Sequence, residues 1–242
     1  MRAARTRWIV GGLGGLLVVG LVASLFFFGI VRFNNPPSSR YPVRGVDVSS
    51  YQGPIDWTTL SRQGIAFAFI KATEGSGYED ERFQANLAAA RTAGLRVGAY
   101  HFFSFESGGA SQASNFESVV PIFDDMLPPV VDLELYGQND PPDPVAVSRE
   151  LTILLAELAD HYGQQPIIYA TEQSYRLYLA GSFPDYDIWI RNVLTSPGLP
   201  DGRTWTFWQY TSREHLSGYS GQRYIDMNVF NGTAAEFASY GR

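Results

Sequence analysis

Short apolar runs recur along the chain from residue 41 onward, and most of them are bounded by glycine, proline or polar residues. Runs of four to eight residues rich in Val, Ile and Phe are typical of strands that are buried on both faces. The sequence therefore predicts five strands in the first part of this region, at residues 43–49, 66–71, 97–103, 130–134 and 166–170.

Between these strands, apolar residues recur every three or four positions, which is the spacing of a helix with one buried face. The clearest case is 144–161, where Pro144 occupies the first turn, a position that proline favours. Strands that alternate with helices form a parallel sheet with right-handed crossovers. The other helices are predicted at residues 57–63, 81–93 and 111–123.

The pattern changes after residue 180, where three further strands are predicted without clear helices between them. They lie at residues 187–190, 206–210 and 225–230 and are joined by loops rich in Gly and Pro. Helices in only the first five units predict an α/β fold: a modified TIM-like barrel with five βα units and three terminal strands. In such barrels the functional residues lie at the carboxyl ends of the strands.

The N-terminal region has a different composition from the rest of the chain. Residues 8–31 contain no charged residue and exceed the roughly 20 apolar residues that span a bilayer. Three arginines and no acidic residue precede them, which predicts that residues 1–7 are cytoplasmic. We therefore predict a transmembrane signal anchor at 8–31, a linker at 32–40 and one extracytoplasmic domain at 41–242. The alternative is a cleaved signal peptide and a secreted protein.

Charge and residue usage exclude several classes of function for the predicted domain. Residues 41–242 hold 13 basic and 24 acidic residues, a net charge of −11, so a nucleic-acid partner, which requires a basic face, is not expected. The chain has three histidines, no cysteine and no HExxH spacing, so neither a metal nor a cofactor is predicted. A GxSxG nucleophile motif is also absent.

A pair of carboxylates stands at the end of the fourth predicted strand. Asp132 and Glu134 are two positions apart, so in an extended strand both point to the same face. Mutual repulsion should keep one of them protonated near neutral pH, which supplies an acid and a charged partner in one place. Glycoside hydrolysis needs such a pair. A structural ion pair or a helix cap explains the same residues, and both interpretations stay open.

Other strand ends carry polar and aromatic side chains. An acidic floor with an aromatic wall suits a sugar, because aromatic faces cover its C–H surfaces and carboxylates bind its hydroxyls. Structural alternatives exist: Asp56 is expected to cap a helix, and His101 fits a hydrogen-bonded core histidine. Besides Asp132 and Glu134, the candidate site residues are Asp47, Tyr51, Lys71, Glu74, Tyr100, Tyr169, Trp208, Tyr210 and Asp226.

Six separated motifs occur in one order along the chain. They are Gly45-Val46-Asp47-Val48-Ser49-Ser50-Tyr51-Gln52-Gly53, Phe69-Ile70-Lys71-Ala72-Thr73-Glu74-Gly75, Tyr100-His101-Phe102, Asp132-x-Glu134, Trp208-Gln209-Tyr210-Thr211 and Asp226-x-Asn228-x-Phe230. In these motifs the chain resembles the muramidases of glycoside hydrolase family 25. It departs from the family pattern at residues 189–193, where a more aromatic strand end is expected.

The resemblance implies hydrolysis of the β-1,4 bond between N-acetylmuramic acid and N-acetylglucosamine in peptidoglycan glycan strands. It maps the family's four site carboxylates onto Asp47, Asp132, Glu134 and Asp226. We expect Glu134 to act as general acid and Asp132 to orient the substrate's acetamido group as internal nucleophile. Direct attack by a carboxylate remains the second route. A chitinase-like hydrolase and a non-catalytic glycan-binding module are the alternative functions.

Overall fold

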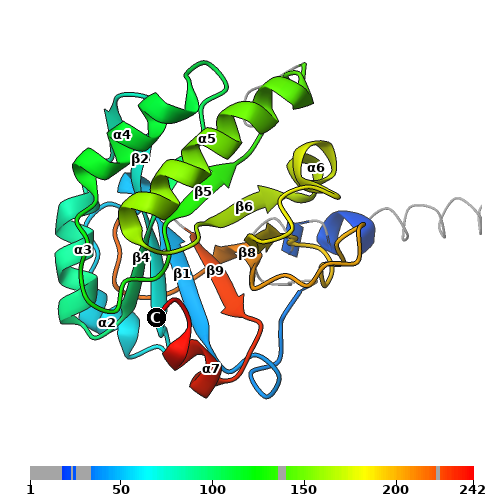
Figure 1. Ribbon diagram of the computed structural model, residues 1–242. Helices are drawn as coiled ribbons and strands as arrows, with labels where there is room; N and C mark the ends of the chain where they lie inside the picture. The colour runs from blue at the N-terminus through cyan, green and yellow to red at the C-terminus, as the bar shows by residue number, and fades with distance from the viewer. Residues whose placement is uncertain (1–17, 23, 26–33, 136–139, 222–223) are drawn as a thin grey trace, which may run out of the picture.

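The computed structural model describes residues 18–22, 24–25, 34–135, 140–221 and 224–242. One nine-stranded sheet forms the centre of the molecule, and eight of its strands close into a barrel through the pairing of β1 with β2 (Figure 1). Only β9 runs antiparallel to both of its barrel neighbours. The barrel strands are β1 (Arg44–Val48), β2 (Phe67–Glu74), β4 (Arg96–Phe102), β5 (Val130–Leu133), β6 (Ile167–Thr171), β7 (Asp187–Arg191), β8 (Phe207–Glu214) and β9 (Ile225–Phe230).

The predicted barrel with five βα units and three terminal strands is confirmed. A helix follows each of the first five barrel strands, whereas β7 and β8 lead through loops into the next strand. The short strand β3 (Tyr78–Glu79), which pairs only with β2, was not predicted. The helices are α2 (Trp57–Ser61), α3 (Phe83–Thr92), α4 (Gly109–Val119), α5 (Pro144–Tyr162), α6 (Glu172–Ser174), a π-helical turn at Tyr175–Leu179 and α7 (Ala234–Ser239).

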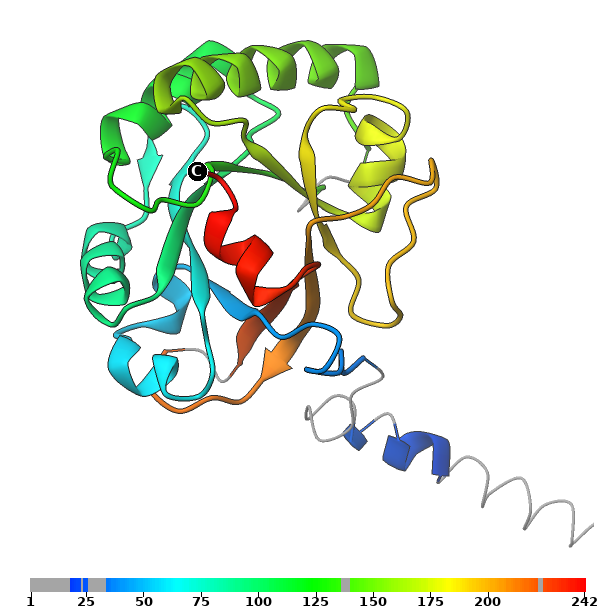
Figure 2. The same cartoon turned by 60° about the horizontal axis from the view of Figure 1, so that its bottom comes forward.

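The C-terminal helix α7 lies across the amino-terminal opening of the barrel (Figure 2). The ring of Phe237 lies 5.4 Å from the ring of Phe67 and 5.2 Å from that of Phe230, centroid to centroid. These contacts continue the core of the barrel and close its lower end. The opposite end, where the parallel strands finish, is therefore the open one.

Side chains alternate along each strand between the barrel interior and the layer beneath the helices. In β2, Phe67 and Phe69 pack inside the barrel, whereas Ala68 and Ile70 belong to the outer core. Gly45 provides space for the interior rings, because a Cβ there would overlap the ring of Phe67. The same alternation carries every second residue at the strand ends into the open mouth of the barrel.

Most of the predicted anchor at 8–31 lies outside the described residues; of it, residues 18–22 and 24–25 are described, and they are helical. Among the described residues, no helix has both the length and the apolar content that a membrane span requires. The anchor and its boundaries therefore stay predictions. The linker is joined to the barrel at the buried Asn34, whose Nδ2 donates hydrogen bonds to the carbonyl oxygens of Asn192 (3.0 Å) and Thr195 (2.9 Å).

Close packing of α4 against α5 gives a stability prediction. Gly109 lies against the backbone of α5, and a Cβ there would overlap the carbonyl oxygen of Glu150 and lie 2.9 Å from the amide nitrogen of Leu154. We expect Gly109→Ala to destabilise the protein by about 1–3 kcal/mol and to lower the thermal midpoint by several degrees. Gly198→Ala is the matched control, because a Cβ at this exposed position meets no atom within 4 Å. Equal midpoints for the two variants would contradict this packing.

Candidate active site

A pocket of about 580 Å³ opens at the carboxyl ends of the barrel strands. All eight barrel strands, or the residues directly after them, contribute side chains to its wall. Nine of the eleven predicted site residues line it, so residues far apart in the chain meet at one place. They are Asp47, Tyr51, Lys71, Glu74, Tyr100, Asp132, Glu134, Tyr169 and Asp226.

The structure corrects the prediction that Trp208 and Tyr210 line the site. Both are buried on the outer face of β8, where the indole of Trp208 donates a hydrogen bond to the carbonyl oxygen of Asn192 (2.8 Å). The guanidinium of Arg44 donates one to the hydroxyl of Tyr210 (2.6 Å). Because side chains alternate along a strand, Gln209 between them is the residue that faces the pocket. Phe207 packs inside the barrel, and residues two positions apart in a strand share a face, so this alternation predicts that Gln209 points inward.

The side chain of Asp47, at the base of the pocket, is held by neutral amides that belong to the sequence motifs but were not among the candidate site residues. The Nε2 atom of Gln209 donates to both carboxyl oxygens (3.0 Å each), and the Nδ2 atom of Asn228 donates to Oδ1 (2.7 Å). The hydroxyl of Tyr169 donates to Oε1 of Gln209 (3.0 Å), which fixes the orientation of the amide. Asp47 is therefore a rigid part of the pocket.

Burial raises the pKa of Asp47, Asp132 and Asp226. It raises the pKa of Asp47 to about 6, against the opposing hydrogen bonds from Asn228 and Gln209. Burial also raises the pKa of Asp132 well above its ordinary value, and the nearby charges of Glu134 and Asp47 add to that effect. The pKa of Asp226 is likewise raised well above its ordinary value, first by burial and then by the charge of Asp47. The site therefore retains protons at pH values at which exposed carboxylates have lost them.

The two members of the Asp132–Glu134 pair have different surroundings. Asp132 is the more buried, with 8% of its surface exposed, and its Oδ1 atom has no hydrogen-bond partner among the described residues. Glu134 follows the last residue of β5, is only half-buried and lines the pocket. An inner carboxyl that lacks a partner thus lies beside an outer carboxyl that a ligand can reach.

The remaining polar wall is formed by an ion pair between aromatic rings. The Nζ atom of Lys71 lies 2.6 Å from a carboxylate oxygen of Glu74. It also lies 5.0 Å from the ring centroid of Phe102 and 5.3 Å from that of Tyr78. At the rim, the side chain of Tyr51 is 70% exposed, so its ring is available to a ligand that enters the pocket.

His101 and Asp56 have structural roles, the first as a hydrogen-bonded core residue and the second as a helix cap. His101 points away from the pocket, with Nδ1 2.7 Å from the hydroxyl of Thr73 and Nε2 3.0 Å from Oε1 of Gln112. Burial lowers its pKa to about 4, so the ring is neutral near pH 7. Asp56 caps α2 by accepting a hydrogen bond from the amide of Thr59 (3.0 Å), as predicted.

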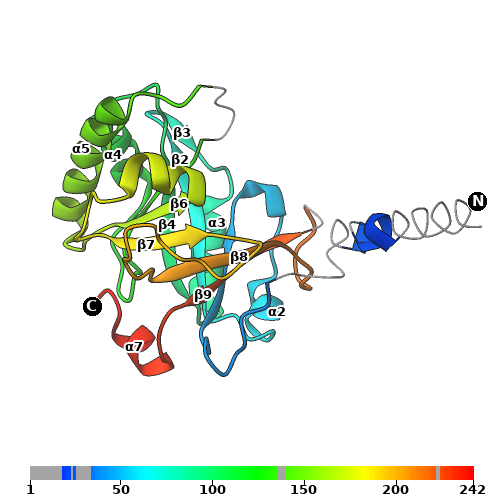
Figure 3. The same ribbon diagram turned by 90° about the vertical axis from the view of Figure 1, so that its right-hand side faces the viewer.

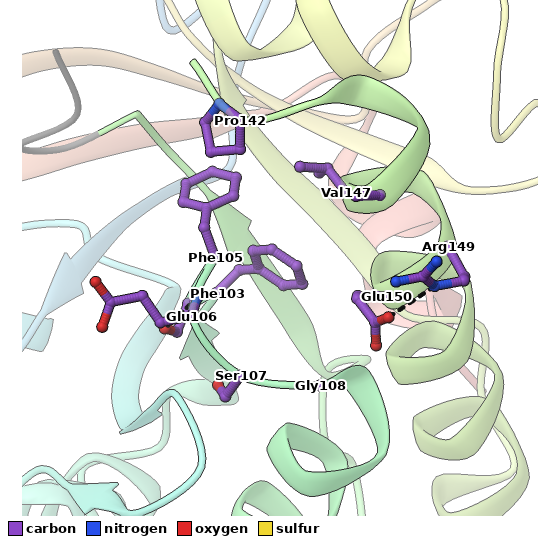
Figure 4. A pocket seen from close by; sticks show the side chains of 11 residues that line it. Phe103, Phe105, Glu106, Ser107, Gly108, Pro142, Val147, Arg149 and Glu150 are labelled. Atoms are coloured by element: carbon purple, nitrogen blue, oxygen red, sulfur yellow. Dashed lines mark hydrogen bonds and ion pairs between the residues drawn. The ribbon is translucent and has the colours of Figure 1, made fainter. Parts of the chain in front are cut away.

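A second hollow, of about 250 Å³, lies between the loop after β4 and the start of α5 (Figure 4). Phe103, Phe105 and Val147 supply its apolar wall, and Arg149 forms an ion pair with Glu150 at 2.8 Å on its far side. None of the four predicted catalytic carboxyls lines it. The chemistry of the molecule is therefore assigned to the barrel mouth.

Buried carboxyls beside aromatic side chains at the open mouth of a βα barrel are an arrangement that glycoside hydrolases use. The family model for glycosyl hydrolases family 25 matches residues 46–219. The chain belongs to this family.

Individual relatives agree with this assignment. A solved family 25 glycosyl hydrolase from Bacillus anthracis is 49% identical, with a TM-score of 0.83 over 88% of this chain and 98% of that one. The crystal structure of the lysozyme from Streptomyces coelicolor is 32% identical, with a TM-score of 0.74 over 82% of this chain and 96% of that one. Lysozyme M1 of Streptomyces globisporus is 34% identical over 82% of this chain and 71% of its own length.

Proposed function

We propose that this glycoside hydrolase is a muramidase that cleaves the β-1,4 bond between N-acetylmuramic acid and N-acetylglucosamine in peptidoglycan. The observation that carries the proposal is the pairing of a reachable Glu134 with a buried Asp132 in the pocket at the barrel mouth. Relatives that are named lysozymes support peptidoglycan as the substrate. The domain is acidic as a whole, so a net positive charge does not contribute to binding its glycan.

Glu134 is assigned as the general acid. Its carboxyl group donates a proton to the glycosidic oxygen as the bond to the anomeric carbon breaks, so the departing sugar leaves as a neutral alcohol. A half-buried side chain at the end of β5 can reach that oxygen and still exchange protons with solvent. In the second step, the resulting carboxylate takes a proton from the attacking water and returns to its starting form.

The acetamido group of the muramic acid is assigned as the internal nucleophile. The carboxyl group of Asp132, which lines the pocket beside Glu134, provides an acceptor for the acetamido N–H, which aims the carbonyl oxygen at the anomeric carbon. That oxygen displaces the leaving sugar and forms a cyclic intermediate, which water then opens. Asp47 is less suited to direct attack, because both of its oxygens already accept hydrogen bonds from Gln209 and one also accepts from Asn228.

Release of reducing ends distinguishes this function from the two alternatives. The protein is incubated separately with purified peptidoglycan and with chitin, and new reducing ends are counted over time. A muramidase releases them from peptidoglycan and leaves chitin intact. A chitinase-like enzyme attacks chitin, and a non-catalytic glycan-binding module sediments with one of the polymers without releasing reducing ends from either.

We further propose that residues 8–31 hold the enzyme at the outer face of a membrane, which would keep an acidic domain close to an anionic wall. Asn34 fastens the linker to the loop after β7, so the linker meets the domain beside the pocket. We expect the full chain to sediment with membranes and to resist extraction by 1 M salt. Recovery of a shortened, soluble form lacking residues 8–31 would contradict anchoring and indicate cleavage and secretion.

A further inference from the structure

Arg191 is a positively charged residue of the pocket that has no role in the proposed catalytic mechanism. It is the last residue of β7 and lies in register with Thr171 of β6 and Gln209 of β8. Its half-buried side chain lines the same pocket as Asp47 and Asp226. It also falls within the segment 189–193, where the sequence departs from the family pattern.

Among the described residues, the guanidinium of Arg191 makes no hydrogen bond and no ion pair. The other cation that lines the pocket, Lys71, already forms an ion pair with Glu74 at 2.6 Å, so it is less available to bind an anionic ligand. Arg191 still acts on its surroundings, because its positive charge opposes the rise in the pKa of Asp47 and Asp226. Five N–H donors without an acceptor thus face a cavity that is large enough for a sugar.

The end of β7 is held rigidly next to this side chain. The Nδ2 atom of Asn192 donates to a carboxylate oxygen of Glu172 (2.6 Å) and to the hydroxyl of Thr195 (2.9 Å). Its carbonyl oxygen accepts from Asn34 (3.0 Å) and from the indole of Trp208 (2.8 Å). The backbone that carries Arg191 is therefore fixed before a ligand arrives, which lowers the cost of ordering the side chain around one.

We infer that Arg191 determines specificity by binding the lactyl carboxylate of a muramic acid whose stem peptide has been removed. This inference rests on the proposed muramidase function. A guanidinium matches a carboxylate with two parallel N–H donors, and such charge-assisted pairs are stronger than neutral hydrogen bonds. The lactyl group carries this charge only when it is free, because amide linkage to a peptide leaves a neutral carbonyl. Protons retained by the buried Asp226 reduce the repulsion that the bound anion meets.

The inference places the enzyme in a reaction sequence. A free lactyl carboxylate arises when the amide bond between muramic acid and the first amino acid of the stem is hydrolysed. Water supplies the hydroxyl group of the new carboxylic acid, and the peptide leaves with a free amine. The preferred substrate is thus the product of an amidase reaction, and this enzyme then cuts the peptide-free strand into short fragments.

The test compares two glycan preparations from one batch of purified peptidoglycan, one with its stem peptides and one from which an amidase has removed them. Values of kcat/KM are measured with the full-length protein in detergent for the wild type, Arg191→Gln and Arg191→Lys. We expect the wild type to prefer the peptide-free strands by about tenfold, the increment of one charge-assisted contact. Arg191→Gln should bring the ratio close to one, mainly through KM, and Arg191→Lys should retain part of the preference.

The control is Arg149→Gln, because Arg149 is an exposed arginine of the second hollow and does not line the catalytic pocket (Figure 4). It should keep the wild-type ratio. Equal wild-type rates on the two preparations, or an unchanged ratio in Arg191→Gln, would overturn the role of Arg191. So would an equal loss of kcat on both substrates, which indicates a general effect on the site. Absence of cleavage by the wild type on either preparation would instead overturn the muramidase function.

Discussion

Replacing Glu134 by glutamine is expected to lower kcat on purified peptidoglycan by roughly 10²- to 10⁴-fold, the usual contribution of a general acid. Glutamine has nearly the same shape but carries no transferable proton, so the glycosidic oxygen would have to leave as an alkoxide. The half-buried carboxyl at the end of β5 contacts the pocket rather than the core, so KM and the thermal midpoint should change little. Steady-state release of reducing ends measures kcat and KM together.

Two controls separate loss of the acid from general damage. Glu106→Gln alters an exposed carboxylate outside the catalytic pocket and should leave the rate unchanged. The second control is an aryl glycoside with a dinitrophenyl group, which leaves as dinitrophenolate without protonation. Glu134→Gln should therefore lose far less activity on this substrate than on peptidoglycan. Near-wild-type cleavage of peptidoglycan by Glu134→Gln, or equal losses on the two substrates, would remove Glu134 from the role of general acid.

Replacing Asp132 by asparagine is expected to lower kcat by roughly 10²- to 10³-fold and to stabilise the protein at neutral pH. The activity falls because a charge that orients the acetamido group is lost. The stability rises because burial disfavours the ionised form of Asp132, as its raised pKa shows. Because the pKa of Asp132 is raised in the folded state, proton binding by this group favours folding fully at pH values below its ordinary pKa of 3.8. This contribution to stability is lost as the pH rises from 3.8 through the raised pKa of the folded state. The variant should therefore be more stable than the wild type at pH 7.5 and equally stable at pH 3.

Thermal or denaturant unfolding at the two pH values measures the stability difference, with Asp160→Asn, an exposed carboxylate on α5, as the control. The catalytic role is read from substrates whose N-acetyl group is replaced by N-trifluoroacetyl, a weaker nucleophile. The wild-type rate should fall with this replacement, and the rate of Asp132→Asn should depend on it much less. Identical dependence in the two proteins, or a variant that is less stable at pH 7.5, would contradict the assignment.

The fold was largely predictable because its signal is local. Buried parallel strands appear in the sequence as apolar runs, so β9 was placed with the correct ends and β1 within a residue of its start and end. The helix α7 was not predicted, since six residues give too little periodicity and its position depends on the ring contacts of Phe237. The strand β3 has two residues and exists only through its pairing with β2.

The carboxylates of the site were also predictable, since charged residues at the ends of apolar runs stand out. The roles of the neutral partners were not predictable. Gln209 and Asn228 belong to the sequence motifs, but only the closed barrel brings both of them to Asp47. The aromatic character of Trp208 predicted a site residue, whereas the alternation along β8 places it in the outer core. The protonation pattern also depends on tertiary burial, which raises the pKa of Asp47 and Asp226 as well as that of Asp132.

We propose that Glu134 and Asp132 together cleave the bond on the reducing side of N-acetylmuramic acid. The most direct test is mass spectrometry of borohydride-reduced fragments that the wild-type protein releases from purified peptidoglycan, because reduction marks the sugar at each new end. The mechanism predicts reduced N-acetylmuramic acid at every new end. Reduced N-acetylglucosamine at these ends, or the absence of new ends, would contradict it.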